Sequence, residues 1–323
     1  MQTNRSARPG GFLLLLTALL FLLTVPAGAL FDHDDTAMGN GQAPIAENLS
    51  LTTYRDVGIC GALAAVDPQG DPVTFRVTKN PARGSLAFGT EGDPAFTYTP
   101  YEGKTGKDSF TYVAEDSQGN VSQPATVSVK IKKADTKVTY ADMSGHPAHR
   151  AAIALAERKL FVGEQLGDTW FFRPETPVSR EEFLAMAMDV VGLDTMESSP
   201  LSGFADGETI AVWARPYVAS ALMSGMVQGC GTDPAGALFE PARTMTQTEA
   251  AVLLDRLLRL SDVPSDGEIP TAAPAWAAQP VANLQAVGVL KGDAALSASL
   301  TRGDAAQMLL SAMEVLDFRA QRW

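Results

Sequence analysis

Histidine and cysteine are nearly absent from this chain, with three and two copies among 323 residues. A structural zinc site therefore lacks its usual nitrogen and sulfur ligands, and a dense disulfide framework is excluded. Positive charge is also scarce, because 25 Lys and Arg face 37 Asp and Glu, for a formal net charge of −12. We expect no general binding of nucleic acid, which needs a basic face, and no docking on anionic lipid.

Long apolar runs are missing except for one near the amino end. Residues 12–25 are uncharged and almost wholly apolar, follow Arg5 and Arg8, and precede three small residues at 27–29. This pattern predicts a secretory signal peptide over residues 1–29. The alternative is a membrane anchor, but 14 residues at about 1.5 Å each fall short of a bilayer core of about 30 Å. We expect an exported, extracellular chain that does not span the membrane after cleavage.

After a polar linker at 30–43, the sequence changes to short β-branched and aromatic runs. Runs such as Val73–Val77 and Ala125–Ile131 alternate with period two, and turns such as Asp67–Asp71 separate them. Period-two strands between regularly spaced turns predict an antiparallel β-sandwich over residues 44–133. The charged stretch 132–139 that follows reads as a linker between domains.

The segments AAVDPQGDPVTFRVTKNPARGSLAF and GKDSFTYVAEDSQGNVSQPATVSVKI carry a resemblance within this module. They resemble the bacterial Ig-like, cadherin-like modules of surface proteins. The resemblance implies a spacer or adhesion unit, and it leaves any surface ligand of the module unidentified.

Three acidic residues of the β module, Asp67, Asp71 and Asp116, allow two interpretations. Clustered carboxylates suit calcium, which takes oxygen ligands. Asp residues beside Gly also build turns without metal, because the carboxylate bonds its own backbone. We favour the turns and expect no metal or cofactor.

The two cysteines, Cys60 and Cys230, lie in different modules. We expect small buried side chains, since free cysteine is often buried. An intermolecular bridge outside the cell is the alternative.

From about residue 138 the sequence is helical and repetitive. Each copy has an apolar helix, a loop marked by Gly, and a second helix that opens with Ser/Thr-x-x-acid, which predicts a capping box. Two copies share their spacing residue for residue, and the first copy has Lys159 and Pro147 where the others have Gly and Trp. The matched positions are Trp213, Gly225 and Gly229 in one copy and Trp276, Gly288 and Gly292 in the other.

This arrangement resembles the S-layer homology (SLH) domain in its common set of three, as repeats 138–197, 198–262 and 263–318. The resemblance implies a pseudo-threefold helical spindle that binds an anionic, often pyruvylated, secondary cell-wall polysaccharide in grooves between repeats. The residues that carry it are Phe172-Arg-Pro174 with Ser179-Arg-Glu-Glu182, Phe204-Ala-Asp206 with Trp213-Ala214, Phe239-Glu-Pro241 with Thr246-Gln-Thr-Glu249, and Thr301-Arg-Gly-Asp304.

The signature Arg is the residue that the resemblance assigns to the anionic sugar. Arg180 and Arg302 hold this place at the first helical position, beside unpaired backbone amides that favour anions, whereas one copy has the neutral Gln247. Trp213 and Trp276 also read as core anchors. The expected polysaccharide-binding set is Arg180, Arg302, Gln247, Asp142, Asp206, Trp213 and Trp276.

We therefore expect a non-catalytic cell-wall protein that presents an Ig-like module. The alternative is a surface adhesin in which that module is the main recognition element. A secreted hydrolase is disfavoured because His33, His146 and His149 do not form a triad or a complete metal site. No stretch outside the two modules is long enough for a catalytic domain.

Overall fold

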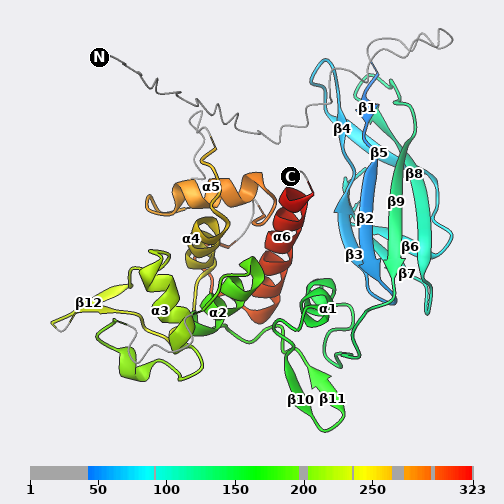
Figure 1. Cartoon of the computed structure of the whole chain (residues 1–323). Helices are drawn as coiled ribbons and strands as arrows, with labels where there is room; N and C mark the ends of the chain where they lie inside the picture. Colours follow the sequence, from blue (N-terminus) through cyan, green and yellow to red (C-terminus); the bar gives the residue numbers. More distant parts are fainter. Residues whose placement is uncertain are drawn as a thin grey trace, which may run out of the picture.

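The computed structural model describes residues 43–90, 92–195, 203–234, 236–263, 273–291 and 295–321. The predicted signal peptide lies outside the described residues, as does the predicted linker up to residue 42. A β-rich module comes first and a helical region follows, which confirms the predicted order (Figure 1). None of the helices in the described ranges has the length and apolar character needed to cross a bilayer.

The β module packs a four-stranded sheet, in the order β2-β9-β8-β5, against a three-stranded sheet, in the order β3-β7-β6. A short ribbon of β1 and β4 completes it. Alternate residues of β9 are buried, as its sequence predicted. The strands are β1 Ile45–Ala46, β2 Leu49–Tyr54, β3 Ile59–Ala62, β4 Ala65–Val66, β5 Val73–Lys79, β6 Gly84–Phe88, β7 Ala95–Pro100, β8 Gly106–Asp116 and β9 Ala125–Lys132.

One pairing corrects the prediction of a wholly antiparallel sandwich. Strand β2 pairs parallel to β9, with Ser50 opposite Ser128. A parallel pair needs a long connection between its strands, and the whole module separates these two. The alternation of side chains is the same for both pairings, so the sequence pattern does not distinguish them.

Asp108 on β8 ties the two sheets together. Its carboxylate accepts hydrogen bonds from the Tyr98 hydroxyl of the opposite sheet and from the backbone amides of Ala82 and Arg83, at 2.8, 2.9 and 2.8 Å. Burial by itself would raise the pKa of this carboxyl, but these bonds together hold the pKa below its ordinary value.

The helical region consists of three helix pairs, which we call unit 1 (α1, α2), unit 2 (α3, α4) and unit 3 (α5, α6). The predicted capping boxes are present at the start of α2, α4 and α6. The backbone is left-handed at Gly225 and Gly288 and also at Lys159. The elements are α1 His149–Glu157, β10 Glu164–Leu166, β11 Thr169–Phe171, α2 Arg180–Val191, η1 Gly207–Thr209, α3 Arg215–Met223, β12 Gly231–Asp233, β13 Gly236–Leu238, α4 Gln247–Leu258, α5 Ala278–Ala286 and α6 Arg302–Ala320.

The three units are linked in a closed cycle of backbone hydrogen bonds, just ahead of their second helices. The Val178 amide donates to the Leu300 carbonyl, the Leu300 amide to Met245, and the Met245 amide to Val178, at 2.9, 2.7 and 3.0 Å. Helices α2, α4 and α6 contact one another beside this ring. Each first helix packs on the second helix of another unit: α1 on α6, α3 on α2, and α5 on α4.

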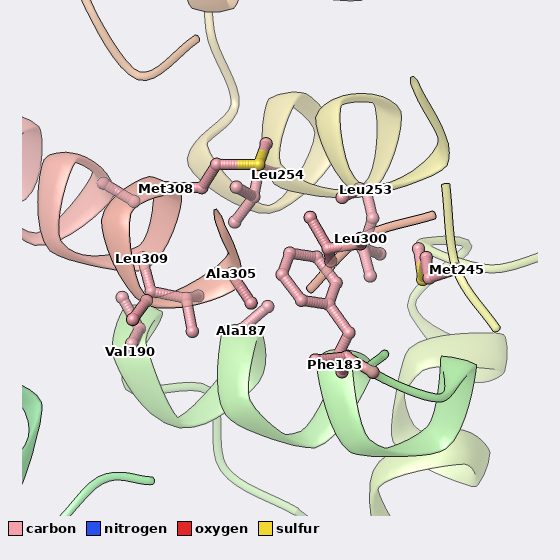
Figure 2. Packing of buried hydrophobic residues seen from close by; sticks show 14 of the residues in the cluster. Phe183, Ala187, Val190, Met245, Leu253, Leu254, Leu300, Ala305, Met308 and Leu309 are labelled. Atoms are coloured by element: carbon pink, nitrogen blue, oxygen red, sulfur yellow. The ribbon is translucent and has the colours of Figure 1, made fainter. Parts of the chain in front are cut away.

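The helices enclose an apolar core that draws on all three units. Figure 2 shows the Phe183 ring of α2 directed toward Leu300, with Leu253 of α4 and Ala305 of α6 around it. Phe183, Leu300 and Ala305 are fully buried. No single helix pair could enclose these side chains alone, so the units depend on one another for their stability.

The stretch 132–139 is largely exposed, as a linker between domains would be, and contacts between the modules lie beside it. Tyr54 and Val57 of the β module belong to the same buried cluster as the helical core. The Tyr54 hydroxyl donates to Glu157 of α1 at 2.6 Å, and the other oxygen of that carboxylate accepts the Asp135 amide, also at 2.6 Å. Burial, with Glu157 adjacent, raises the pKa of Tyr54. A packed and bonded junction therefore joins the two modules.

The Asp108 hydrogen bonds generate a prediction about pH. We expect Asp108→Asn to destabilise the protein at pH 7 by about 1.5–3 kcal/mol, because charged hydrogen bonds are lost. A depressed folded-state pKa means that stability is present above about pH 4 and is lost as the pH falls through the folded pKa. Urea unfolding at pH 7 and pH 3 should therefore show a deficit that shrinks with acid. A deficit of constant size would contradict this account.

Candidate functional site

The three units follow one another around the ring, and the first residue of each second helix bonds to the loop of another unit. This cyclic order places each candidate groove between two units rather than within one. The amide of Arg180 donates to Arg243 of unit 2, that of Gln247 to Ala298 of unit 3, and that of Arg302 to Thr176 of unit 1. Each signature residue therefore faces the loop of the next unit around the ring. We call these places the Arg180 groove, the Gln247 groove and the Arg302 groove.

The Arg180 groove is a cavity of about 350 Å³ that all three units line. Unit 1 supplies Arg180 and unit 2 supplies Phe239 and Glu249. Trp276 of unit 3 completes the wall. The Arg180 guanidinium lies 5.2 Å from the centre of the Phe239 ring, a distance at which a cation is attracted to an aromatic face.

The Arg180 guanidinium is mostly buried but only loosely paired. Its side chain is 12% exposed, and the nearest carboxylate contact, to Glu249, is 4.0 Å. The Nε atom is buried and has no hydrogen-bond partner among the residues that the structure describes. A buried donor without a partner costs free energy, so the Arg180 side chain is held in place at that cost.

Glu249 does not neutralise Arg180 because Arg243 holds it. The Arg243 guanidinium bonds both oxygens of the Glu249 carboxylate and also pairs with Glu240. Burial would raise the pKa of Glu249, but Arg243 and the Thr246 amide together lower it. The carboxylate stays charged and occupied, so the guanidinium of Arg180 remains open to an anion.

Arg302 has the same place in its own groove but a more enclosed setting. Its guanidinium lies 4.1 Å from the centre of the Phe161 ring and 5.5 Å from that of Phe172. Its Nε donates to the Phe172 carbonyl at 2.8 Å. Burial lowers its pKa. The Arg302 guanidinium therefore makes more contacts within the protein than the Arg180 guanidinium does.

Asp142 and Asp206 hold the loops that carry the groove phenylalanines. The Asp142 carboxylate accepts the amides of Phe172 and Arg173 at 2.9 and 2.6 Å. Asp206 accepts the amides of Phe239 and Glu240 at 2.8 and 2.7 Å.

The residue after each phenylalanine, Arg173 in one loop and Glu240 in the other, has a positive φ of 55° or 57°. The Asp bonds support this strained backbone. Asp142 and Asp206 therefore position the loops that carry Phe172 and Phe239.

The Gln247 groove combines every departure from the repeat signature. Its first helix position is the neutral Gln247. The Thr248 amide donates to Leu296, which thereby takes the place that Pro174 and Pro241 hold in the other units. Two residues before Leu296 the sequence has Ala294 instead of Phe. Helix α1 packs on α6 at this groove, in the same way that α5, which follows Trp276, packs on α4 at the Arg180 groove. The residue ahead of α1 that corresponds to Trp276 is Pro147.

The two tryptophans are not core anchors, so that interpretation is wrong. Trp213 is 52% exposed and Trp276 is 61% exposed. Trp276 lines the Arg180 groove. Trp213 precedes α3, which packs on α2 through a hydrogen bond from the Tyr217 hydroxyl to Asp189. Trp213 occupies the position in its repeat that corresponds to Trp276.

Both cysteines are exposed, which corrects the prediction of buried side chains. The Cys230 sulfur lies 2.9 Å from a Glu240 oxygen at the edge of the Arg180 groove. Burial of the sulfur atom and this carboxylate raise the pKa of the thiol. The Cys60 sulfur lies 3.6 Å from the Thr97 hydroxyl.

The three acidic residues considered for calcium, Asp67, Asp71 and Asp116, accept hydrogen bonds in the turns of the β module. One Asp67 oxygen accepts the Gln69 and Asp71 amides, one Asp116 oxygen accepts the Gln118 and Asn120 amides, and the Asp71 carboxylate accepts the Gln118 side-chain amide. In the described part of the chain, no group of three or more His, Cys, Asp or Glu residues is placed to hold a metal ion.

His146 lies just ahead of α1, and His149 is the first residue of that helix. His146 contacts Glu175 at 3.2 Å. Burial lowers the pKa of His149.

Comparisons with known families match two segments of the chain. Residues 41–133 match the bacterial cadherin-like domain, and residues 139–184 match the S-layer homology domain. The second match falls on unit 1. No curated protein matches the chain.

The solved structures that resemble this chain are distant. An endo-fucoidan hydrolase of glycoside hydrolase family 107 is 23% identical, with a TM-score of 0.25, over 30% of this chain and 14% of that one. A mutant of the SrpA adhesin from Streptococcus sanguinis is 16% identical, with a TM-score of 0.22, over 31% of this chain and 66% of that one. Fibronectin(III)-like modules of CbhA from Clostridium thermocellum are 17% identical, with a TM-score of 0.21, over 30% of this chain and 51% of that one.

The difference between the two arginines generates a prediction about stability. We expect Arg302→Ala to lower stability by about 1 kcal/mol or more, because the stacked guanidinium and its bond to Phe172 are lost. Arg180→Ala should lower stability less, since that guanidinium has weaker internal bonding. Thermal unfolding of both variants, with circular dichroism as the control for folding, measures the order. Equal losses would refute the distinction between the two grooves.

Proposed function

We propose that the chain is a non-catalytic cell-surface protein that its helical region fastens to the cell wall. Residues 138–197, 198–262 and 263–318 act as three SLH repeats in this proposal. The family match to residues 139–184 supports the first repeat. The closed ring of hydrogen bonds, with the three capping boxes, supports the other two, since units 2 and 3 repeat the bonding of unit 1.

The ligand in this proposal is an anionic secondary cell-wall polysaccharide, pyruvylated where the polymer carries ketals. The Arg180 guanidinium, which lines the groove and has its nearest carboxylate contact at 4.0 Å, is the observation that carries the choice. A guanidinium presents paired donors that match a carboxylate. Phe239 and Trp276 supply apolar surface beside it for a sugar ring. Because the whole chain is acidic, attraction of an anion depends on such local positive sites.

The three grooves are unequal in this proposal. The Arg180 groove has its cation and its aromatic neighbours. The Arg302 groove has a cation that is stacked and partly bonded within the protein. The Gln247 groove lacks the cation, the phenylalanine and the tryptophan together. We infer two binding grooves per chain, with the Arg180 groove the stronger.

An adhesin whose β module is the main recognition element is the second candidate function. A cationic groove on that module favours it, and its ligand is argued below. The two functions are compatible, since one concerns the helical region and the other the β module.

The ranking of grooves yields a binding prediction. We expect Arg180→Ala to weaken binding to purified wall polysaccharide about tenfold or more, since a charged hydrogen bond contributes about 1.5–3 kcal/mol. Arg302→Ala should have a smaller effect and Gln247→Ala the smallest. Titration calorimetry on variants with unchanged helical spectra measures this, with Arg215→Ala as a matched control outside the grooves. The largest loss in Gln247→Ala would overturn the role given to the signature Arg.

The location of wall binding is tested with fragments. We expect residues 134–323 to sediment with cell-wall sacculi, and residues 43–133 to retain less than about a tenth of that bound fraction. Extraction of the polysaccharide from the sacculi should abolish the binding. Predominant binding by the β fragment would instead establish the adhesin function as the main one. Because Tyr54 and Val57 leave the helical core in these fragments, the intact chain serves as the reference.

A further inference from the structure

The solvent face of the β2-β9-β8-β5 sheet carries a groove that the wall-anchoring proposal does not use. Strand register aligns Ser50, Ser128 and Ser109 in one row across three strands. The next row is Thr52, Lys130 and Lys107. We call these six residues, with Arg83 at the rim, the serine–lysine groove. They line a cavity of about 560 Å³.

The alternation of side chains explains why these residues face solvent. Val127, Val129 and Ile131 of β9 point into the sandwich and are buried. Their neighbours Ser128 and Lys130 must then point to the other face. On β8 the same alternation places Phe110 inside and Lys107 and Ser109 outside.

The groove concentrates positive charge at a cost to the fold. Lys107 lies directly opposite Lys130 in the β8–β9 register. Like charges in a cross-strand pair are destabilising. Neither ammonium forms an ion pair with a carboxylate anywhere in the described ranges. This occurs in a chain whose formal net charge is −12.

One carboxylate, that of Asp108, borders the groove, but its bonds are already made. Its oxygens accept from the Ala82, Arg83 and Ser109 amides and from the Tyr98 hydroxyl. The paired lysines therefore have no ion-pair partner of their own, and the one Asp108 charge offsets only one of the three cations at the groove.

We propose that the serine–lysine groove binds an anionic saccharide. The lysines and Arg83 meet carboxylate or sulfate groups, and the four Ser and Thr hydroxyls exchange hydrogen bonds with sugar hydroxyls. The cavity has the size of a small-ligand site. Its lining includes no aromatic side chain, so the stacking on which single-stranded nucleic acid binding depends has no platform there. This inference stands independently of wall anchoring, because the groove belongs to the other module.

The test uses the full chain with Arg180→Ala and Arg302→Ala in every sample, which removes the signature arginine from both helical grooves. The probes are polygalacturonate, dextran sulfate and neutral dextran. We expect Lys107→Ala with Lys130→Ala to raise the Kd for at least one anionic probe tenfold or more, and neutral dextran not to bind. Hydrogen exchange of β8 and β9 peptides should slow when the probe is added and should not slow in the double variant.

The matched control removes the same charge elsewhere on the module. Lys104→Ala with Lys133→Ala should leave the Kd within about twofold and keep the parent melting temperature. The Lys107→Ala and Lys130→Ala double variant should melt no lower than the parent, because a like-charge pair is removed. A preference for polygalacturonate identifies a carboxylated saccharide, and a preference for dextran sulfate identifies a sulfated one. Equal losses in both double variants, equal binding of neutral dextran, or tighter binding of poly(U) RNA would each overturn the proposal.

Discussion

The closed cycle of backbone hydrogen bonds through Val178, Met245 and Leu300 is the constraint on which the helical region depends. It brings the amino ends of α2, α4 and α6 together and directs each toward the loop of a different unit. Because the cycle closes, no unit can shift without breaking bonds in two others. The capping boxes begin immediately after this ring, so the ring also sets where the second helices start.

The sharing of each groove between units follows from that ring. A change in one repeat therefore does not disable the groove of that repeat alone. Gln247 and Pro147 lie in two different repeats, yet the cyclic order assigns both positions to one groove. The chain thereby keeps two grooves with their arginine and aromatic residues, instead of three that are each impaired.

The distribution of charge follows a similar logic on both modules. The chain is acidic overall, and its positive side chains are effective for binding only where carboxylates are absent or already occupied. Arg243 occupies Glu249 beside Arg180, and backbone amides occupy Asp108 beside the lysines. The contact between Tyr54 and Glu157 joins the two modules beside the stretch that connects them.

The sequence by itself determined the local structure of this protein. Apolar alternation identified the strands around Phe110 and Val127, and Ser/Thr-x-x-acid identified the starts of α2, α4 and α6, because both patterns act over a few residues. Arg180 and Arg302 were identified from the resemblance of their segments to the SLH signature.

Only the tertiary structure decided which distant residues meet. The exposure of Trp213 and Trp276, the parallel pairing of β2 with β9, the positioning role of Asp142, and the lysine pair across β8 and β9 all depend on contacts between remote segments. Periodicity specifies the face on which a side chain lies, whereas its neighbour on that face is set by how the elements close around one another.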